Sequence, residues 1–184
     1  MFLFIKLLSG LIIVLIIIGI LTALGSIFTN PIASLISASL LSLIANQIID
    51  TLGHQTNAQG YRVRTPLTHT ITRSVFWGLI PAVILFLLFG SLDKLPALHL
   101  NGEQPYWILL QGIFAGPLHM VLDAITEGGI FVKTKGRFKR YALAHIKYNN
   151  LFWNMFFQLL GIGLIFFVFY LHGFHGGHYG SRTI

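Results

Sequence analysis

The sequence AGPLHMVLDAITEGG, residues 115–129, combines an apolar segment with three ionisable side chains. His119, Asp123 and Glu127 follow one another at intervals of four residues, so on an α-helix they lie along one face. Because charge is costly to hold inside a membrane-spanning helix, these side chains are expected to mark a functional site. A polar pair that ties two helices together by hydrogen bonds is the simpler alternative.

The composition around this stretch is that of a membrane protein. Of the 184 residues, 55% are hydrophobic and only 9% are charged, whereas soluble domains carry about a quarter charged residues. The fold class we predict is an all-α integral membrane protein, a single domain over residues 1–184 built as a bundle of about five transmembrane helices. The chain has no cysteine, which excludes disulfides and thiolate metal sites.

The predicted membrane spans are apolar segments long enough to cross a bilayer. They cover residues 7–24, 27–49, 69–92, 106–127 and 150–171. A cleaved signal peptide is the alternative for the first segment, and its length favours a retained helix. Within the second, small residues at intervals of four predict close packing against another helix: Ser34, Ala38 and Ser42. The Gly- and His-rich tail, residues 172–184, is predicted to be mobile and outside the site, together with its histidines His172, His175 and His178.

The distribution of basic residues predicts the orientation. Five spans place the N-terminus and the loops 51–68 and 130–149 on one side, which holds all of the Lys and Arg residues except Lys94 and Arg182. By the positive-inside rule this side is cytoplasmic, in the inner or plasma membrane. We attribute the net charge of +7 to this topology and to anionic lipid headgroups at the basic loop 133–147, rather than to nucleic acid.

The same topology predicts a metal site at the cytoplasmic face. The second helix ends near Asp50 and His54, the third begins at His69, and the fourth ends near His119 and Asp123. The predicted ligands of a divalent metal are His119 and Asp123, joined by His69 and by His54 or Asp50. We expect the ion to be zinc, which takes three or four such ligands. The ion would activate water for hydrolysis. Catalytic roles are predicted for Glu127 or Asp50 as general base. Three arginines flank His69 and are predicted to hold a phosphate or carboxylate of the substrate: Arg62, Arg64 and Arg73.

Three segments also resemble a known family. Residues 118–126, LHMVLDAIT, resemble the S-H-x-L-x-D-x-x-T segment of the YdjM-like membrane-bound metal-dependent hydrolases, which include proteins described as LexA-binding inner-membrane hydrolases. Residues 67–70 are similar to the second motif of that family, H-R-G-x-T-H-S, with Arg64 where the family has histidine. Asp50 and His54 are similar to its first motif, D-x-x-D-H, whose paired aspartates are not reproduced. The core RTPLTH, residues 64–69, is closer to that of uncharacterised archaeal membrane proteins.

The resemblance spans about residues 45–140 and implies a multi-helix membrane fold, a divalent metal and a hydrolase activity. The function we predict is therefore a membrane-embedded metal-dependent hydrolase that acts on a lipid or another phosphoester. The alternative is a non-catalytic membrane protein with a structural polar or metal cluster and a basic face that binds a partner or lipid. A transporter is disfavoured because the ionisable residues gather at one end of the spans rather than at the midplane. The substrate and the oligomeric state stay open.

Overall fold

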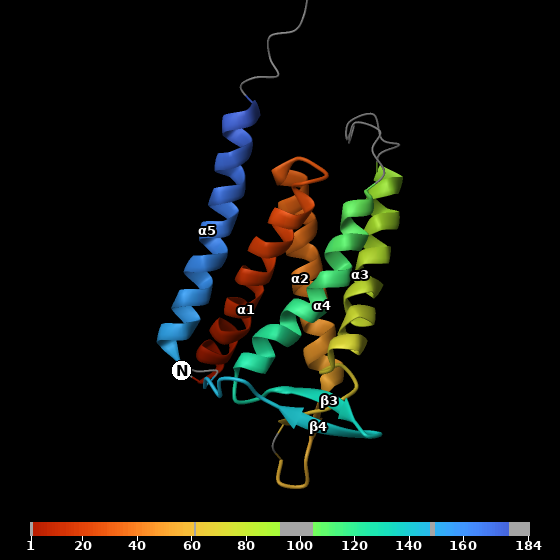
Figure 1. Ribbon diagram of the computed structural model, residues 1–184, viewed down its shortest axis with the longest axis vertical. Coiled ribbons are helices and arrows are strands. Elements are labelled where there is room, and N and C mark those ends of the chain that lie inside the picture. Colours follow the sequence, from red (N-terminus) through yellow and green to blue (C-terminus); the bar gives the residue numbers. More distant parts are fainter. Residues whose placement is uncertain (1, 61, 93–104, 148–149, 177–184) are drawn as a thin grey trace, which may run out of the picture.

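A computed structural model describes residues 2–60, 62–92, 105–147 and 150–176 of the chain. Within these ranges the chain forms five α-helices and two β-hairpins (Figure 1). In chain order the elements are α1 (Phe2–Gly25), α2 (Pro31–Gly53), β1 (His54–Thr56), β2 (Arg62–Arg64), α3 (Ile71–Leu92), α4 (Tyr106–Ile125), β3 (Ile130–Thr134), β4 (Arg137–Tyr141) and α5 (Leu151–Gly176).

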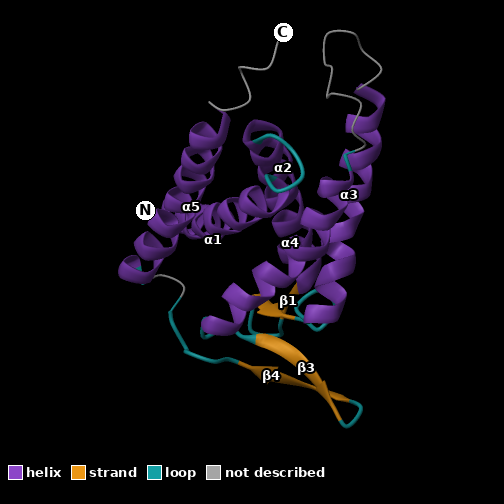
Figure 2. Cartoon of the chain, turned by 45° about the horizontal axis from the view of Figure 1, so that its top comes forward, coloured by secondary structure: helices purple, strands orange, loops and turns teal. Residues whose placement is uncertain are grey.

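The helices lie side by side, and the two hairpins gather at one end of the bundle (Figure 1). At that same end α2 and α4 finish and α3 and α5 begin. Figure 2 shows β1 and the β3–β4 hairpin next to the C-terminal end of α4. The alternating direction of successive helices therefore brings several helix ends and both hairpins to one level, which we call the hairpin end of the bundle.

Four helices are long and apolar enough to cross a membrane: Pro31–Gly53, Ile71–Ser91, Tyr106–Ile125 and Leu151–Gly173. In α1 the apolar stretch identified in the described part is Val14–Gly25, so the crossing of a membrane by this helix stays a prediction. The prediction of a mostly helical chain is confirmed, and four of its helices have the length and composition needed to span a membrane.

Small residues set the distances between neighbouring helices. The predicted stripe on α2 is buried, with Ser34 and Ala38 fully inaccessible and Ser42 nearly so, which confirms its packing role. Between α3 and α4, a Cβ atom on Gly116 would collide with the backbone carbonyl of Ser74. Gly161 in α5 is equally constrained by the backbone of α1. Such positions let helix backbones approach closely, which is how helices associate in lipid.

A buried hydrogen-bond network holds the opposite end of the bundle together. The Gln111 side chain on α4 donates to the carbonyl oxygen of Leu21 on α1 at 2.9 Å and to the hydroxyl of Ser34 on α2 at 3.1 Å. It accepts a hydrogen bond from the hydroxyl of Ser37 at 2.6 Å. Polar side chains are thus not confined to one end of the spans, and the network cross-links three helices in surroundings where unpaired polar groups are costly.

The two hairpins correct the prediction of an all-α chain. In β3–β4 the strands are joined by Lys135 and Gly136, both with positive φ (47° and 80°). This backbone twist is typical of the two-residue turns that join antiparallel strands. In β1–β2, His54 pairs with Arg64. Both predicted loops therefore contain a short antiparallel pair of strands.

Several helix boundaries also differ from the prediction. Helix α2 continues to Gly53, beyond the predicted residue 49, and α4 ends at Ile125 instead of 127 because Thr126 is extended (φ −83°, ψ 164°). Helix α5 continues to Gly176, so the first part of the predicted mobile tail is helical. The rest of that tail, including His178, lies outside the described residues.

We expect Gly116→Ala to destabilise the bundle by about 1–3 kcal/mol, because the added methyl group has no space against Ser74 and overpacking costs this much. Gly163→Ala is the matched control, since a Cβ at that helical position meets no atom within 4 Å. Thermal unfolding in detergent measures both variants. Equal melting temperatures for the two would contradict the close contact between α3 and α4.

Candidate metal centre

Three buried side chains converge at the hairpin end: His69, His119 and Asp123, none of them more than 2% exposed. The Nε2 atom of His119 lies 3.3 Å from Oδ2 of Asp123, and Nε2 of His69 lies 3.6 Å from the same oxygen. Zinc–ligand bonds of 2.0–2.1 Å at tetrahedral angles place neighbouring ligand atoms about 3.3–3.5 Å apart. Both distances to Oδ2 are close to this value, and all three donor atoms lie within 4.8 Å of one another, so they could hold one shared cation.

Helix α4 and a tight turn position the three side chains. His119 and Asp123 are one helical turn apart on α4, so both point to the same side. His69 lies in the turn between β2 and α3, which packs against the end of α2 at Gly53. A Cβ atom on Gly53 would collide with the side chains of Thr68 and His69, so glycine permits this close approach.

The donor atoms at the centre of this cluster have no hydrogen-bond partner among the described residues. They are Nε2 of His69, both ring nitrogens of His119 and Oδ2 of Asp123. Leaving a buried polar group unsatisfied costs about 1–3 kcal/mol, and more for a charged group. A cation bound between the three side chains would satisfy one nitrogen of each histidine and the free carboxylate oxygen together.

The hydroxyl of Thr68 fixes the tautomer of His69. Thr68 Oγ1 donates its only proton to the carbonyl oxygen of Ile49 at 2.9 Å. At the same time it lies 2.9 Å from Nδ1 of His69, and it can only accept there. His69 must therefore carry its proton on Nδ1, which leaves the lone pair of Nε2 directed at the cluster. A histidine that donates its other N–H in this way is typical of metal ligands.

The protonation of His69 is consistent with a ligand role. Burial lowers the pKa of His69 to about 3, and the positive charge of Arg64 acts in the same direction, whereas the Asp123 carboxylate opposes both. The imidazole is therefore neutral at pH 7, and neutral imidazole is the form that binds metal.

Arg64 holds the other oxygen of the Asp123 carboxylate. Its Nη2 donates to Oδ1 of Asp123 at 2.6 Å, and its Nη1 donates to the carbonyl oxygen of Gly129 at 3.0 Å. The arginine supplies a counter-charge but does not form a paired hydrogen bond with both carboxylate oxygens. Oδ2 consequently stays directed at His69 and His119. The substrate contact of Arg64 stays a prediction, while these two donors position Asp123.

Asp50 and His54 form the outer part of the cluster. Oδ1 of Asp50 lies 3.7 Å from Nε2 of His119, and the Asp50 side chain is 45% exposed. Nδ1 of His54 contacts the carbonyl oxygen of Asp50 at 2.7 Å, so the proton lies on Nδ1 and the lone pair on Nε2. Asp50, His54 and His69 make a second possible ligand set. Since His69 has a single available lone pair, it can complete only one of the two sets, which favours one ion.

The structure thus brings together all five predicted ligands, and it separates Glu127 from them. Helix α4 ends before Glu127, whose side chain is exposed, and its backbone carbonyl accepts a hydrogen bond from Arg140. The guanidinium of Arg73 lies over the ring of Phe138, away from Asp123. Thr68, which contacts His69, was not among the predicted site residues, although its position directly before His69 was the available signal.

A family model described as a protein of unknown function, DUF1286, matches residues 6–122. The match includes Asp50, His54, Arg64, His69 and His119 and ends one residue before Asp123. No curated protein and no solved structure matches the chain.

We expect Thr68→Val to weaken zinc binding by about 10–100-fold, because His69 would lose the acceptor that holds its proton on Nδ1. Thr68→Ser keeps the hydroxyl and should restore the affinity. Competition with a chromophoric chelator measures both variants. Wild-type affinity in Thr68→Val would show that the hydroxyl does not set the tautomer.

Proposed function

The chain belongs to the DUF1286 family of proteins of unknown function, and we propose that it is a membrane-embedded, metal-dependent hydrolase. In this proposal His69, His119 and Asp123 hold one divalent cation. Two imidazoles and a carboxylate are a ligand set that suits zinc. The observation that carries the proposal is the convergence within 4.8 Å of three buried donor atoms that have no hydrogen-bond partner among the described residues.

Three protein ligands leave a coordination position open, as catalytic zinc sites do. When bound, a divalent cation acts as a Lewis acid and makes water a nucleophile near neutral pH. Asp50 lies beside this position, 3.7 Å from His119, and its half-exposed carboxylate is the group that reaches both the cluster and solvent. We assign Asp50 as the general base, which accepts the proton of the attacking water. Asp50 is preferred to the other predicted base, Glu127, because Glu127 lies beyond the end of α4 with an exposed side chain.

Two further residues position the proposed metal ligands and are not assigned a contact with the substrate. Arg64 neutralises and orients Asp123, and Thr68 orients His69. Catalytic sites depend on such supporting contacts because small displacements of a ligand reduce activity. The resemblance of residues 118–126 to the YdjM-like hydrolases supports metal-dependent hydrolysis as the reaction class.

The location supports a substrate that resides in the membrane. The cluster lies at the ends of spanning helices, beside two hairpins that carry most of the basic residues. We propose that this end faces the cytoplasm, following the positive-inside rule, and that the substrate is a lipid or another phosphoester. Basic side chains at this surface suit a negatively charged headgroup.

One observation favours the non-catalytic alternative. The ion pair between Arg64 and Asp123 compensates the buried carboxylate without any metal, so the cluster could hold helices together as a purely structural element. The metal content of the purified protein separates a metal centre from this metal-free structural cluster, and the rate of hydrolysis separates a catalytic metal centre from a structural one.

We expect wild-type protein, purified without chelators, to contain about one zinc ion per chain by elemental analysis. Asp123→Asn and His119→Ala should lose it, because each removes one of three ligands. His172→Ala is the matched control, since His172 contacts the carbonyl oxygen of Ser26 at the opposite end of the bundle. Absence of metal from wild type, even after incubation with zinc, would leave the structural cluster as the function.

We expect Asp50→Asn to keep the bound zinc and to lower hydrolysis by about 10²–10⁴-fold, the usual contribution of a general base. Chromogenic carboxylic and phosphoric esters report the rate, and the metal content is measured on the same samples. Gln47→Asn is a suitable control, because Gln47 lies on the same helix and its exposed amide donates a hydrogen bond to Thr51, away from the cluster. Unchanged hydrolysis in Asp50→Asn would remove Asp50 from the reaction.

A further inference from the structure

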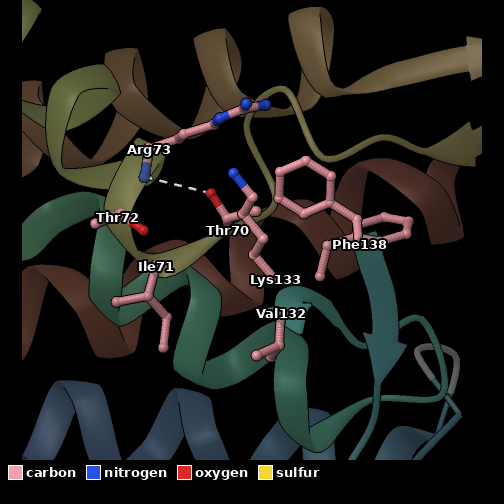
Figure 3. Close-up of a pocket in the computed structure, with 8 residues that line it drawn as sticks. Thr70, Ile71, Thr72, Arg73, Val132, Lys133 and Phe138 are labelled. Carbon is pink, nitrogen blue, oxygen red and sulfur yellow. Dashed lines mark hydrogen bonds between the residues drawn. The ribbon is translucent and has the colours of Figure 1, made fainter. Parts of the chain in front are cut away.

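A hollow lies outside the metal centre, between the first turn of α3 and the β3–β4 hairpin (Figure 3). Its volume is about 420 Å³, within the range of pockets that hold small molecules. Residues 70–73 line one wall, and Phe131, Val132, Lys133 and Phe138 line the other.

The hollow is separated from the metal centre by the chain itself. The side chain of His69 points toward Asp123, whereas its carbonyl oxygen accepts a hydrogen bond from the backbone N–H of Phe131 at 2.7 Å. The lining of the hollow begins at the next residue, Thr70. A ligand in the hollow would therefore contact different groups from a substrate at Asp50 and His119.

The charged groups of the hollow are both cationic. Arg73 and Lys133 line it, and no carboxylate does. Arg73 donates one hydrogen bond to the carbonyl oxygen of Pro66, and its guanidinium lies 5.0 Å from the centre of the Phe138 ring, which holds it in place. In the described part of the chain neither cation forms an ion pair. Figure 3 shows the Lys133 side chain reaching from β3 toward the first turn of α3.

The start of α3 adds hydrogen-bond donors to this charge. The first N–H groups of a helix have no acceptor within the helix. The hydroxyl oxygen of Thr70 accepts a hydrogen bond from the backbone N–H of Arg73 at 3.3 Å. The backbone N–H groups of Ile71 and Thr72 have no acceptor within the helix. A helix start combined with two cations suits a phosphate group.

The hollow also opens at the level where α3 enters its predicted span. Thr72 and Arg73 line the hollow, are exposed, and lie one helical turn before Phe76, so they share a face of α3 with exposed apolar side chains. That face continues along the span with Phe76, Ile80, Val83, Ile84 and Leu87. A soluble phosphate would use the cations alone, whereas a lipid would use the cations and this apolar face together.

We propose that the hollow binds the phosphate group of an anionic membrane lipid, whose acyl chains lie along the exposed apolar face of α3. The occupant is recognised by charge and by its position at the membrane surface. The site is independent of the metal, so it can be tested with the metal removed by a chelator.

The test titrates detergent-purified full-length protein with phosphatidylglycerol, phosphatidylcholine or inorganic phosphate and counts bound ligands by native mass spectrometry. Wild type should bind phosphatidylglycerol in preference to the other two. Lys133→Gln should weaken this binding about fivefold, as expected for about 1 kcal/mol per basic residue near the surface. Arg73→Gln combined with Lys133→Gln should weaken it further.

Lys139→Gln is the matched control, because it removes the same charge from the same hairpin at an exposed position that does not line the hollow. It should bind phosphatidylglycerol as wild type does. Equal weakening in Lys133→Gln and Lys139→Gln would overturn the proposal in favour of diffuse attraction to the hairpin. Equal binding of phosphatidylcholine would overturn it as well. Displacement of the lipid by equimolar phosphate would identify a soluble phosphate compound as the ligand instead. Lys133 is exposed, so its single variant stays informative if the double variant fails to fold.

Discussion

The buried carboxylate of Asp123 is the constraint on which the hairpin end of the bundle depends. A charge at this depth is costly unless it is compensated. Arg64 compensates one oxygen through a short hydrogen bond, and the second oxygen faces His69 and His119. Because Arg64 contacts only one of the two carboxylate oxygens, it holds the Asp123 side chain in place and leaves the other oxygen available to a cation.

The irregular parts of the chain serve this arrangement. Hairpins and turns can lie only where their backbone polar groups find partners, which in a membrane protein means the ends of the spans. The pairing of His54 with Arg64 carries both residues to the end of α2, and the following turn inserts His69 beside them. At the other end, the hydrogen bonds of Gln111 fix α1, α2 and α4 relative to one another. A rigid frame of this kind is what a site with tolerances below an ångström requires.

The two proposed sites share one short segment of chain. At His69 the side chain turns inward to the cluster, and from Thr70 onward the chain lines the hollow and starts α3. A hydrolytic centre and a lipid-binding hollow would therefore lie on opposite sides of the same turn, at the level where spanning helices meet the basic hairpin. A lipid held there would keep the turn in place against the bundle and would position the protein relative to the membrane surface.

The sequence by itself determined the features that depend on local spacing. Apolar length predicted the spans, and the interval of four residues put His119 and Asp123 on one helix face. The alternation of helix directions then indicated that Asp50, His54 and His69 would end at the same level. The tertiary structure decided which groups meet: that Arg64 contacts one oxygen of Asp123, that the Thr68 hydroxyl contacts Nδ1 of His69, and that Glu127 lies beyond the end of α4 with an exposed side chain. These outcomes depend on the register of a hairpin and on the residue at which α4 stops. A change of one residue rotates a helical side chain by about 100°, so spacing alone could not give them.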